Sequence, residues 1–118
     1  MRPSDRLVSR LRDIVLYGER AKQTVRMRSL DELESVEIDA ICYLVLIVSE
    51  ATMQAVALDE TLLGRYKDIP WNEIRATGNR LGHGYATIDH QVIHDVVEHG
   101  HIDKLIDFAR TALERRGL

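Results

Sequence analysis

Apolar residues recur at three- and four-residue intervals near the start of the chain, the spacing that gathers them on one face of a helix. The pattern predicts an amphipathic helix over roughly residues 5–27. Its apolar positions are Leu7, Leu11, Ile14, Val15, Gly18, Ala21 and Val25. The opposite face is charged and includes Arg6 and Arg10. We interpret that face as solvated surface, with a partner-binding surface as the alternative.

The next long segment, residues 36–58, is apolar nearly all round. Its run YLVLIV, taken alone, would also suit a buried strand, because a short apolar run does not separate strand from helix. The three- and four-residue spacing nevertheless continues for more than twenty residues, and no turn signal bounds the run. We therefore predict a central buried helix, preceded by an acidic connection over residues 29–37 that includes a short helical turn.

The remainder of the chain also follows a helical pattern. Residues 61–68 are expected to form a short connection, and residues 70–84 a further helix. A last helical region begins near Asp89, is interrupted at Gly100 and then resumes. Together these segments predict an all-α fold, an antiparallel bundle of four to five helices. A chain of 118 residues suits one domain with one modest core, so residues 1–118 are expected to form a single domain.

Composition narrows the function classes. The formal net charge of −3 gives no overall basic field, so attraction to a nucleic acid would need a local patch. Cys42 is the only cysteine, which excludes an intramolecular disulfide and a cysteine-rich zinc site. The longest apolar run, residues 43–48, is far shorter than the ~20 residues that span a bilayer, and the N-terminus lacks the pattern of a signal peptide. We expect a cytoplasmic protein without a membrane segment.

Candidate chemistry concentrates in the stretch PWNEIRATGNRLGHGYATID, residues 70–89. Arg75, Asn79 and His83 follow one another at four-residue spacing, which places a cation, an amide and an imidazole along one ridge of a helix. Three glycines crowd the same stretch, although each costs about 1 kcal/mol relative to alanine inside a helix. Glycines beside polar groups indicate a close approach by another backbone or by a ligand.

The same stretch resembles the signature of HepT-like HEPN proteins, the small helical ribonuclease toxins of HEPN/MNT toxin–antitoxin pairs. That signature is roughly W-x-x-I followed by R-N-x-L-x-H-x-Y. The matching positions here are Trp71, Ile74, Asn79, Leu81, His83 and Tyr85. One position departs from it, because Gly78 stands where the family has an arginine, five residues before the histidine.

The resemblance implies a HEPN-like, homodimeric bundle and a metal-independent endoribonuclease whose composite site lies across the dimer interface. By this resemblance His83 would be the general acid or base, and Asn79 would hold a phosphate or a neighbouring side chain. An imidazole suits either proton-transfer role near neutral pH. Glu50, at the end of the apolar run, is either a solvent-facing carboxylate or a supporting group that orients this ridge. No metal and no cofactor are predicted.

Gly78 leaves the expected site without its usual charge stabiliser. Arg75 and Arg80 are the candidate substitutes, because either could present a guanidinium fork to a phosphate. Their alternative role is surface charge or an ion pair with Glu73. A catalytically inactive HEPN module that binds RNA, a nucleotide or only its antitoxin partner therefore remains an alternative. A third interpretation is a helical scaffold in which Gly78 and Gly82, four residues apart, let the helices of two subunits pack closely at a dimer interface.

The resemblance also implies a partner, a minimal nucleotidyltransferase antitoxin that modifies Tyr85 with AMP. A bulky, negatively charged group there would block RNA and repel its phosphates. The alternative is that Tyr85 packs at the helix end with its hydroxyl in solvent.

A possible metal-binding face lies further along the chain. His90, His94 and Glu98 share one helical face and could hold a divalent ion. We interpret this face as solvated surface that points away from the neighbouring apolar stripe, and predict no metal there.

Overall fold

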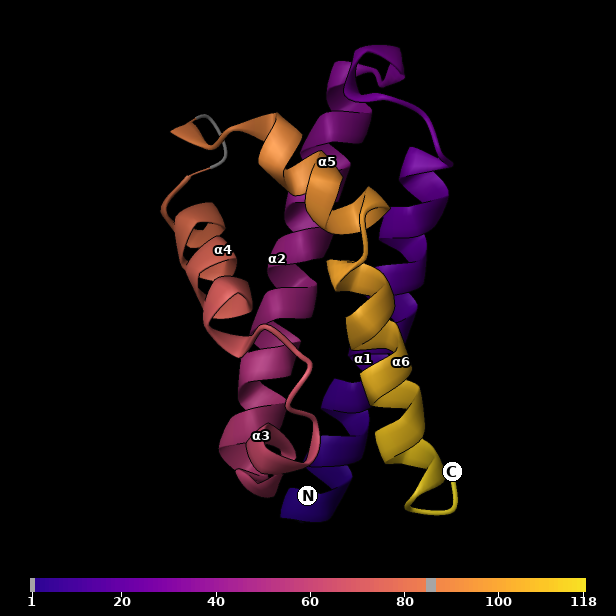
Figure 1. The fold of residues 1–118 in the computed structure, drawn as a ribbon, viewed down its shortest axis with the longest axis vertical. Coiled ribbons are helices and arrows are strands. Elements are labelled where there is room, and N and C mark those ends of the chain that lie inside the picture. The colour runs from indigo at the N-terminus through magenta and orange to yellow at the C-terminus, as the bar shows by residue number, and fades with distance from the viewer. Residues whose placement is uncertain (1, 85–86) are drawn as a thin grey trace.

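The computed structural model describes residues 2–84 and 87–118, and these residues form a bundle of helices (Figure 1). In chain order the elements are α1 (Pro3–Val25), the 3-10 turn η1 (Leu30–Glu32), α2 (Ser35–Leu58), α3 (Thr61–Arg65), α4 (Trp71–His83), α5 (His90–Glu98) and α6 (His101–Glu114). The predicted all-α bundle is confirmed over the described residues. The expected connection after α2 contains one short helix, α3, and the expected turn before α2 is η1.

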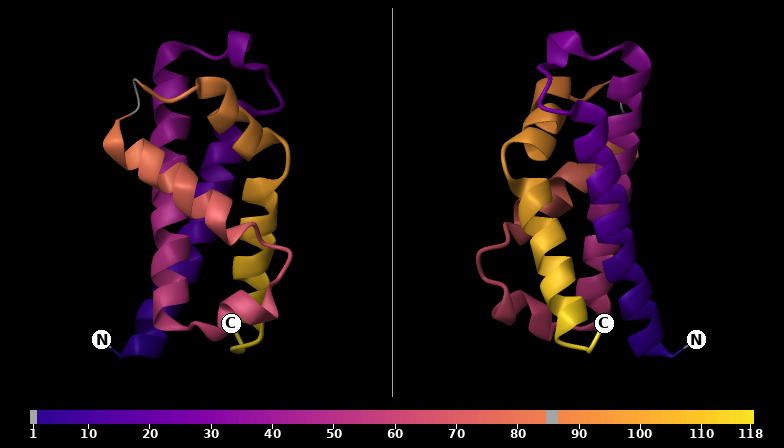
Figure 2. Two further views of the ribbon diagram at one scale, coloured as in Figure 1. Left: turned by 60° about the vertical axis from the view of Figure 1, so that its left-hand side comes forward. Right: turned by 90° about the vertical axis from the view of Figure 1, so that its right-hand side faces the viewer.

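The two longest helices, α1 and α2, lie side by side and run in opposite directions along the long axis of the molecule (Figures 1 and 2). Helix α6 packs on α1, α4 packs on α2, and α5 contacts both long helices. The core between them is aliphatic, with side chains such as Leu11, Ile14, Val45 and Val48 fully buried. This arrangement leaves one side of α2 to be covered by α4, which carries the candidate site residues.

The break predicted at Gly100 is confirmed. Gly100 has a φ of 116°, a backbone conformation that glycine adopts without the steric cost of a Cβ. The chain therefore turns between α5 and α6, and α6 can return along α1.

Helix α2 is the one described helix that is long and apolar enough to cross a membrane by length and composition. Half of its most apolar window is buried inside the molecule. Its buried residues pack against α1, α4 and α5, as expected for the central helix of a globular core.

The prediction that His94 lies on a solvated face of its helix was wrong. Its side chain is buried, with only 4% of the residue exposed, on the same side of α5 as Ile93 and Val97. Nε2 lies 2.6 Å from the backbone carbonyl oxygen of Arg28, to which it donates. The connection between α1 and α2 packs against this side of α5, so the buried surface is wider than the apolar stripe alone. The imidazole is accommodated there because a carbonyl accepts its proton.

We expect His94→Ala to lower the free energy of unfolding by about 2 kcal/mol, because it leaves a carbonyl without its partner and removes buried volume. Urea unfolding followed by circular dichroism would measure the change. The matched control is His99→Ala, at the end of the same helix, whose side chain is 70% exposed. Its effect should stay within about 0.5 kcal/mol. Equal losses in the two variants would contradict this role for His94.

Candidate active site

A groove runs between α2 and α4 and encloses about 590 Å³. We call it the α2–α4 groove. Its lining residues are Ser49, Glu50, Met53, Gln54, Ile74, Arg75, Gly78, Asn79, Gly82 and His83. The structure thus brings four of the predicted site residues together, three from α4 and one from α2.

Apolar anchors fix how α4 lies on α2. Ile74 and Leu81 are buried and lie two turns apart on the same face of the helix. At the start of α4, the Trp71 ring meets the Phe108 ring edge-on, with centroids 5.4 Å apart. With these side chains in the core, the neighbouring ridge of Arg75, Asn79 and His83 borders the groove.

Gly78 is the point of closest approach between the two helices. A Cβ built on Gly78 would lie 2.9 Å from the Cβ of Ser49, closer than real Cβ atoms come. This contact explains a glycine inside α4, because any side chain there would push α4 away from α2. Gly82 is different, since a Cβ on it would meet nothing within 4 Å. The close packing that Gly78 permits is therefore between α4 and α2 of the same subunit.

The polar groups of the groove are accessible to solvent. Glu50, Arg75, Asn79 and His83 are all exposed. The groove accordingly presents a carboxylate, a guanidinium, an amide and an imidazole to a ligand. Glu50 faces solvent, as one of its two interpretations expected. It also lines the groove together with the ridge of Arg75, Asn79 and His83, as the other interpretation needs.

Arg80 lies elsewhere. It is exposed but does not line the α2–α4 groove. The reason is helical geometry, since five residues separate Arg80 from Arg75 and place it about 140° further round the helix. Neither arginine forms an ion pair with a carboxylate of the described residues, and Glu73 instead lies 3.6 Å from His101. Of the two candidate substitutes for the missing arginine, Arg75 is the one at the groove.

Tyr85 lies outside the described residues, directly beyond Gly84.

Sequence reasoning missed three lining residues of α2: Ser49, Met53 and Gln54. The apolar pattern of α2 extends nearly all round, so it does not reveal which side α4 leaves open. The available signal was helical spacing from Glu50, because Gln54 follows it by one turn on the same face.

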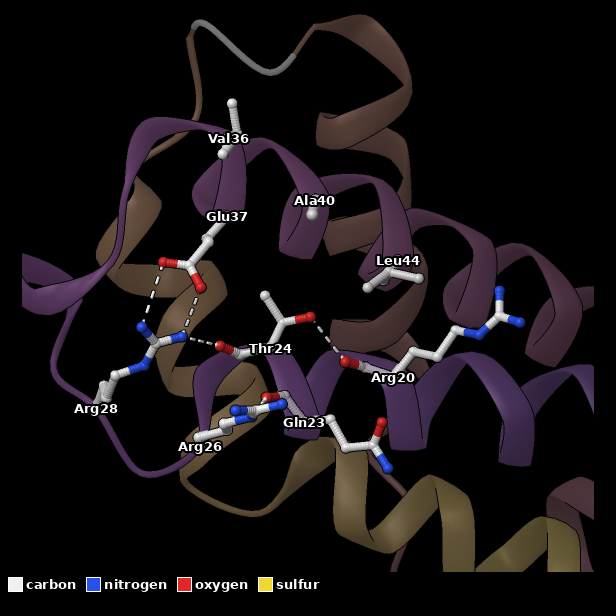
Figure 3. A pocket seen from close by; sticks show the side chains of 9 residues that line it. All are labelled: Arg20, Gln23, Thr24, Arg26, Arg28, Val36, Glu37, Ala40 and Leu44. Atoms are coloured by element: carbon white, nitrogen blue, oxygen red, sulfur yellow. Dashed lines mark hydrogen bonds and ion pairs between the residues drawn. The ribbon is translucent and has the colours of Figure 1, made fainter.

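A second, larger groove of about 660 Å³ lies between the end of α1 and the start of α2 (Figure 3). We call it the Arg28 groove. Its lining residues are Arg20, Gln23, Thr24, Arg26, Arg28, Val36, Glu37, Ala40 and Leu44. The Arg28 guanidinium is held by Glu37 at 2.6 Å and by the carbonyl of Thr24 (Figure 3). No lining side chain is an imidazole, so this groove lacks the acid or base that the α2–α4 groove offers.

Glu37 ties the start of α2 to the end of α1. The hydrogen bond from Arg28, with a second from the backbone N–H of Glu34, holds the pKa of the Glu37 carboxyl below its usual range. A carboxyl whose pKa is lowered on folding stabilises the protein above its unfolded pKa of about 4.3. That contribution is lost as the pH falls through the lower, folded value.

We therefore expect Glu37→Gln to be less stable than the wild type at neutral pH, with the difference shrinking in acid. Urea unfolding midpoints at about pH 7 and about pH 3 would measure the two differences. Asp31→Asn, in the exposed turn η1, is the control, and it should leave the unfolding midpoint at neutral pH close to that of the wild type. A deficit of Glu37→Gln that persists unchanged in acid would contradict this assignment.

A family model described as "Ribonuclease HepT-like" matches residues 14–112, which include the whole α2–α4 groove. Comparisons with curated proteins and with solved structures found no match.

Proposed function

Because the chain belongs to the HepT-like ribonuclease family, we propose that its α2–α4 groove is the catalytic site of a metal-independent endoribonuclease. The observation that carries the proposal is the shared groove, in which Arg75, Asn79 and His83 of α4 face solvent beside Glu50 of α2. These groups are of kinds that RNA cleavage without a metal uses: a proton carrier, a cation and a hydrogen-bond donor.

The reaction is an internal transesterification. A base takes the proton of the 2′-hydroxyl, the 2′-oxygen attacks the adjacent phosphorus, and the bond from phosphorus to the 5′-oxygen breaks. An acid returns a proton to that 5′-oxygen, so the products are a 2′,3′-cyclic phosphate and a 5′-hydroxyl. His83 serves as the acid or the base, since an imidazole exchanges protons near neutral pH.

The other groove residues act on charge and position. Arg75 stabilises the extra negative charge of the phosphate in the transition state, where a preorganised cation has its largest effect. Asn79, one turn from both Arg75 and His83, donates its amide N–H to a phosphate oxygen. Glu50 lines the same groove from α2. It forms no ion pair with Arg75 or His83 among the described residues, so its supporting role would be to orient them once RNA is bound.

The proposal includes a second subunit. One groove holds one His83, whereas the reaction needs both a base and an acid. In a homodimer a composite site would draw one imidazole from each subunit. A minimal nucleotidyltransferase antitoxin would neutralise the enzyme in the cytoplasm by transferring AMP to Tyr85, which follows α4 closely in the chain.

A second candidate function is a catalytically inactive HEPN module that binds RNA, a nucleotide or its antitoxin. Gly78 favours it, because it stands where the resemblance places the family's arginine and a Cβ there would collide with Ser49. If Arg75 does not replace that arginine, the groove retains ligand contacts but loses transition-state stabilisation.

Cleavage of a chimeric oligonucleotide tests the proposal. The substrate is a DNA strand with one ribonucleotide, incubated with purified protein and EDTA beside the all-DNA strand. We expect cleavage only at the ribonucleotide, leaving a 2′,3′-cyclic phosphate. Cleavage that EDTA prevents, or that also occurs in the all-DNA strand, would contradict the proposed mechanism. Binding of RNA without cleavage would favour the inactive module.

A further inference from the structure

A third groove of about 460 Å³, which we call the Arg10 groove, lies between the first turns of α1 and the last turns of α2. Its lining residues are Arg6, Ser9, Arg10, Gln54, Ala57 and Leu58. Gln54 lines both grooves, so the two grooves adjoin at this residue.

The two grooves follow one direction along α2. From Glu50 to Leu58, α2 advances about 12 Å. Helix α4 (Trp71–His83) crosses the middle of α2 and rises toward its His83 end, while the start of α1 and the end of α2 lie at the bottom of the molecule (Figures 1 and 2). Travelling down α2 from His83, a ligand would pass Arg75, then Gln54, then the two arginines of α1.

The Arg10 groove is cationic along its α1 side. Arg10 donates to Gln54 Oε1 at 3.1 Å and to the Ser9 hydroxyl at 3.3 Å, and it lies 3.0 Å from Asp13. These bonds hold its guanidinium in place. Arg6 is exposed and forms no ion pair with a carboxylate of the described residues. One cation is thus fixed at the groove, and a second projects beside it.

Beyond Gln54, the α2 side of the Arg10 groove is apolar, formed by Ala57 and Leu58. A cationic edge beside an apolar floor suits a single nucleic-acid strand, whose phosphates meet the arginines while ribose and base faces lie on the apolar surface. An acidic peptide would satisfy the arginines but would not make use of continuity with the groove of His83.

We propose that the Arg10 groove binds the RNA strand beyond the scissile phosphate, with Arg6 and Arg10 each contacting a backbone phosphate. The inference rests on the proposed function, because it assigns the path of the same substrate. The Arg28 groove is a weaker candidate, since it shares no lining residue with the α2–α4 groove. Arg6 and Arg10 also precede the stretch matched by the family model, so the family match does not itself assign them.

Two physical consequences follow. Phosphate contacts by arginine make binding salt-dependent, with each single-strand contact adding about 0.7 to the slope of log K against log salt. Net charge −3 means that this dependence must come from local cations rather than from the whole surface. Longer RNA should therefore bind more tightly than an RNA too short to reach Arg6 and Arg10.

Binding of a non-cleavable, fully 2′-O-methylated oligonucleotide, followed by fluorescence anisotropy at several salt concentrations, tests the proposal. We expect Arg6→Ala/Arg10→Ala to bind at least tenfold more weakly and to reduce the salt slope by about 1.4. The single variant Arg6→Gln, which leaves the Arg10 hydrogen bonds intact, should reduce it by about 0.7. Arg12→Ala is the matched control, because Arg12 is an exposed arginine of α1 that does not line this groove. Losses in Arg12→Ala equal to those in Arg6→Gln would overturn the proposal.

Cleavage assays separate this inference from the proposed function. If the wild type cleaves RNA, the double variant should cut a long strand at least tenfold more slowly and a dinucleotide at the wild-type rate. Equal slowing on both substrates, or no slowing on either, would overturn the inference and leave the proposed active site standing. If the wild type binds but does not cleave, a reduced salt slope in the variants would still support the Arg10 groove, while the proposed catalysis would fail.

Discussion

His83→Ala is expected to reduce the rate of RNA cleavage by about 100- to 10,000-fold, the range for loss of a general acid or base. The imidazole is exposed at the end of α4, and removing it leaves no buried cavity. We therefore expect the free energy of unfolding and the affinity for non-cleavable RNA to change little. Single-turnover cleavage at saturating enzyme would isolate the chemical step.

A matched control for His83→Ala is His99→Ala, which removes another exposed imidazole outside the α2–α4 groove. It should cleave RNA at the wild-type rate. The pH–rate profile gives a second readout, because a general acid or base contributes one limb of such a profile and the His83→Ala variant should lack that limb. A folded His83→Ala protein that cleaves as fast as the wild type would exclude His83 from the chemistry.

Arg75→Ala is expected to have the second largest effect, a loss of about 100- to 1000-fold in kcat, as for removal of one stabilising donor in other active sites. Arg75 lies at the groove, whereas Arg80 of the same helix does not. Both are exposed arginines, so Arg80→Ala changes the net charge by the same amount and should cost less than about threefold. Steady-state and single-turnover cleavage of the three proteins would measure the difference.

The result for Arg80→Ala decides whether Arg75 is the arginine that stabilises the transition state. A loss in Arg80→Ala as large as that in Arg75→Ala would mean that both act through bulk charge, or that a partner subunit brings Arg80 to the phosphate. Arg75→Lys offers a further check, because a lysine keeps the charge and loses the planar fork. It should recover only part of the activity.

The helices could be predicted from the sequence because each leaves a strong local pattern. The spacing of apolar residues in α1 and α2 gave their extents to within about two residues, the usual uncertainty of helix ends. His94 could not be predicted in this way. Its burial depends on the carbonyl of Arg28, which lies 66 positions away in the chain and accepts a hydrogen bond that no hydrophobic pattern records.

In the candidate site too, features within one helix could be predicted from the sequence, and features that depend on packing between helices could not. The ridge of Arg75, Asn79 and His83 follows from four-residue spacing within a single helix. The choice between Arg75 and Arg80 required the rotation of α4 about its own axis, which the burial of Ile74 and Leu81 sets. Gly78 is similar, since a glycine in a helix indicates a close approach but does not identify Ser49 as the neighbour. The Arg10 groove depends on packing between α1 and α2, two helices whose separate patterns contain no sign of it.

The central claim is that the α2–α4 groove cleaves RNA through His83 without a metal. Its most direct test is a time course of end-labelled RNA with wild type and His83→Ala side by side in EDTA, after both have been shown to be folded and of equal size in solution. We predict cleavage by the wild type alone. Equal cleavage by both proteins, or none by a folded wild type, would contradict the claim, and the second outcome would favour the catalytically inactive module.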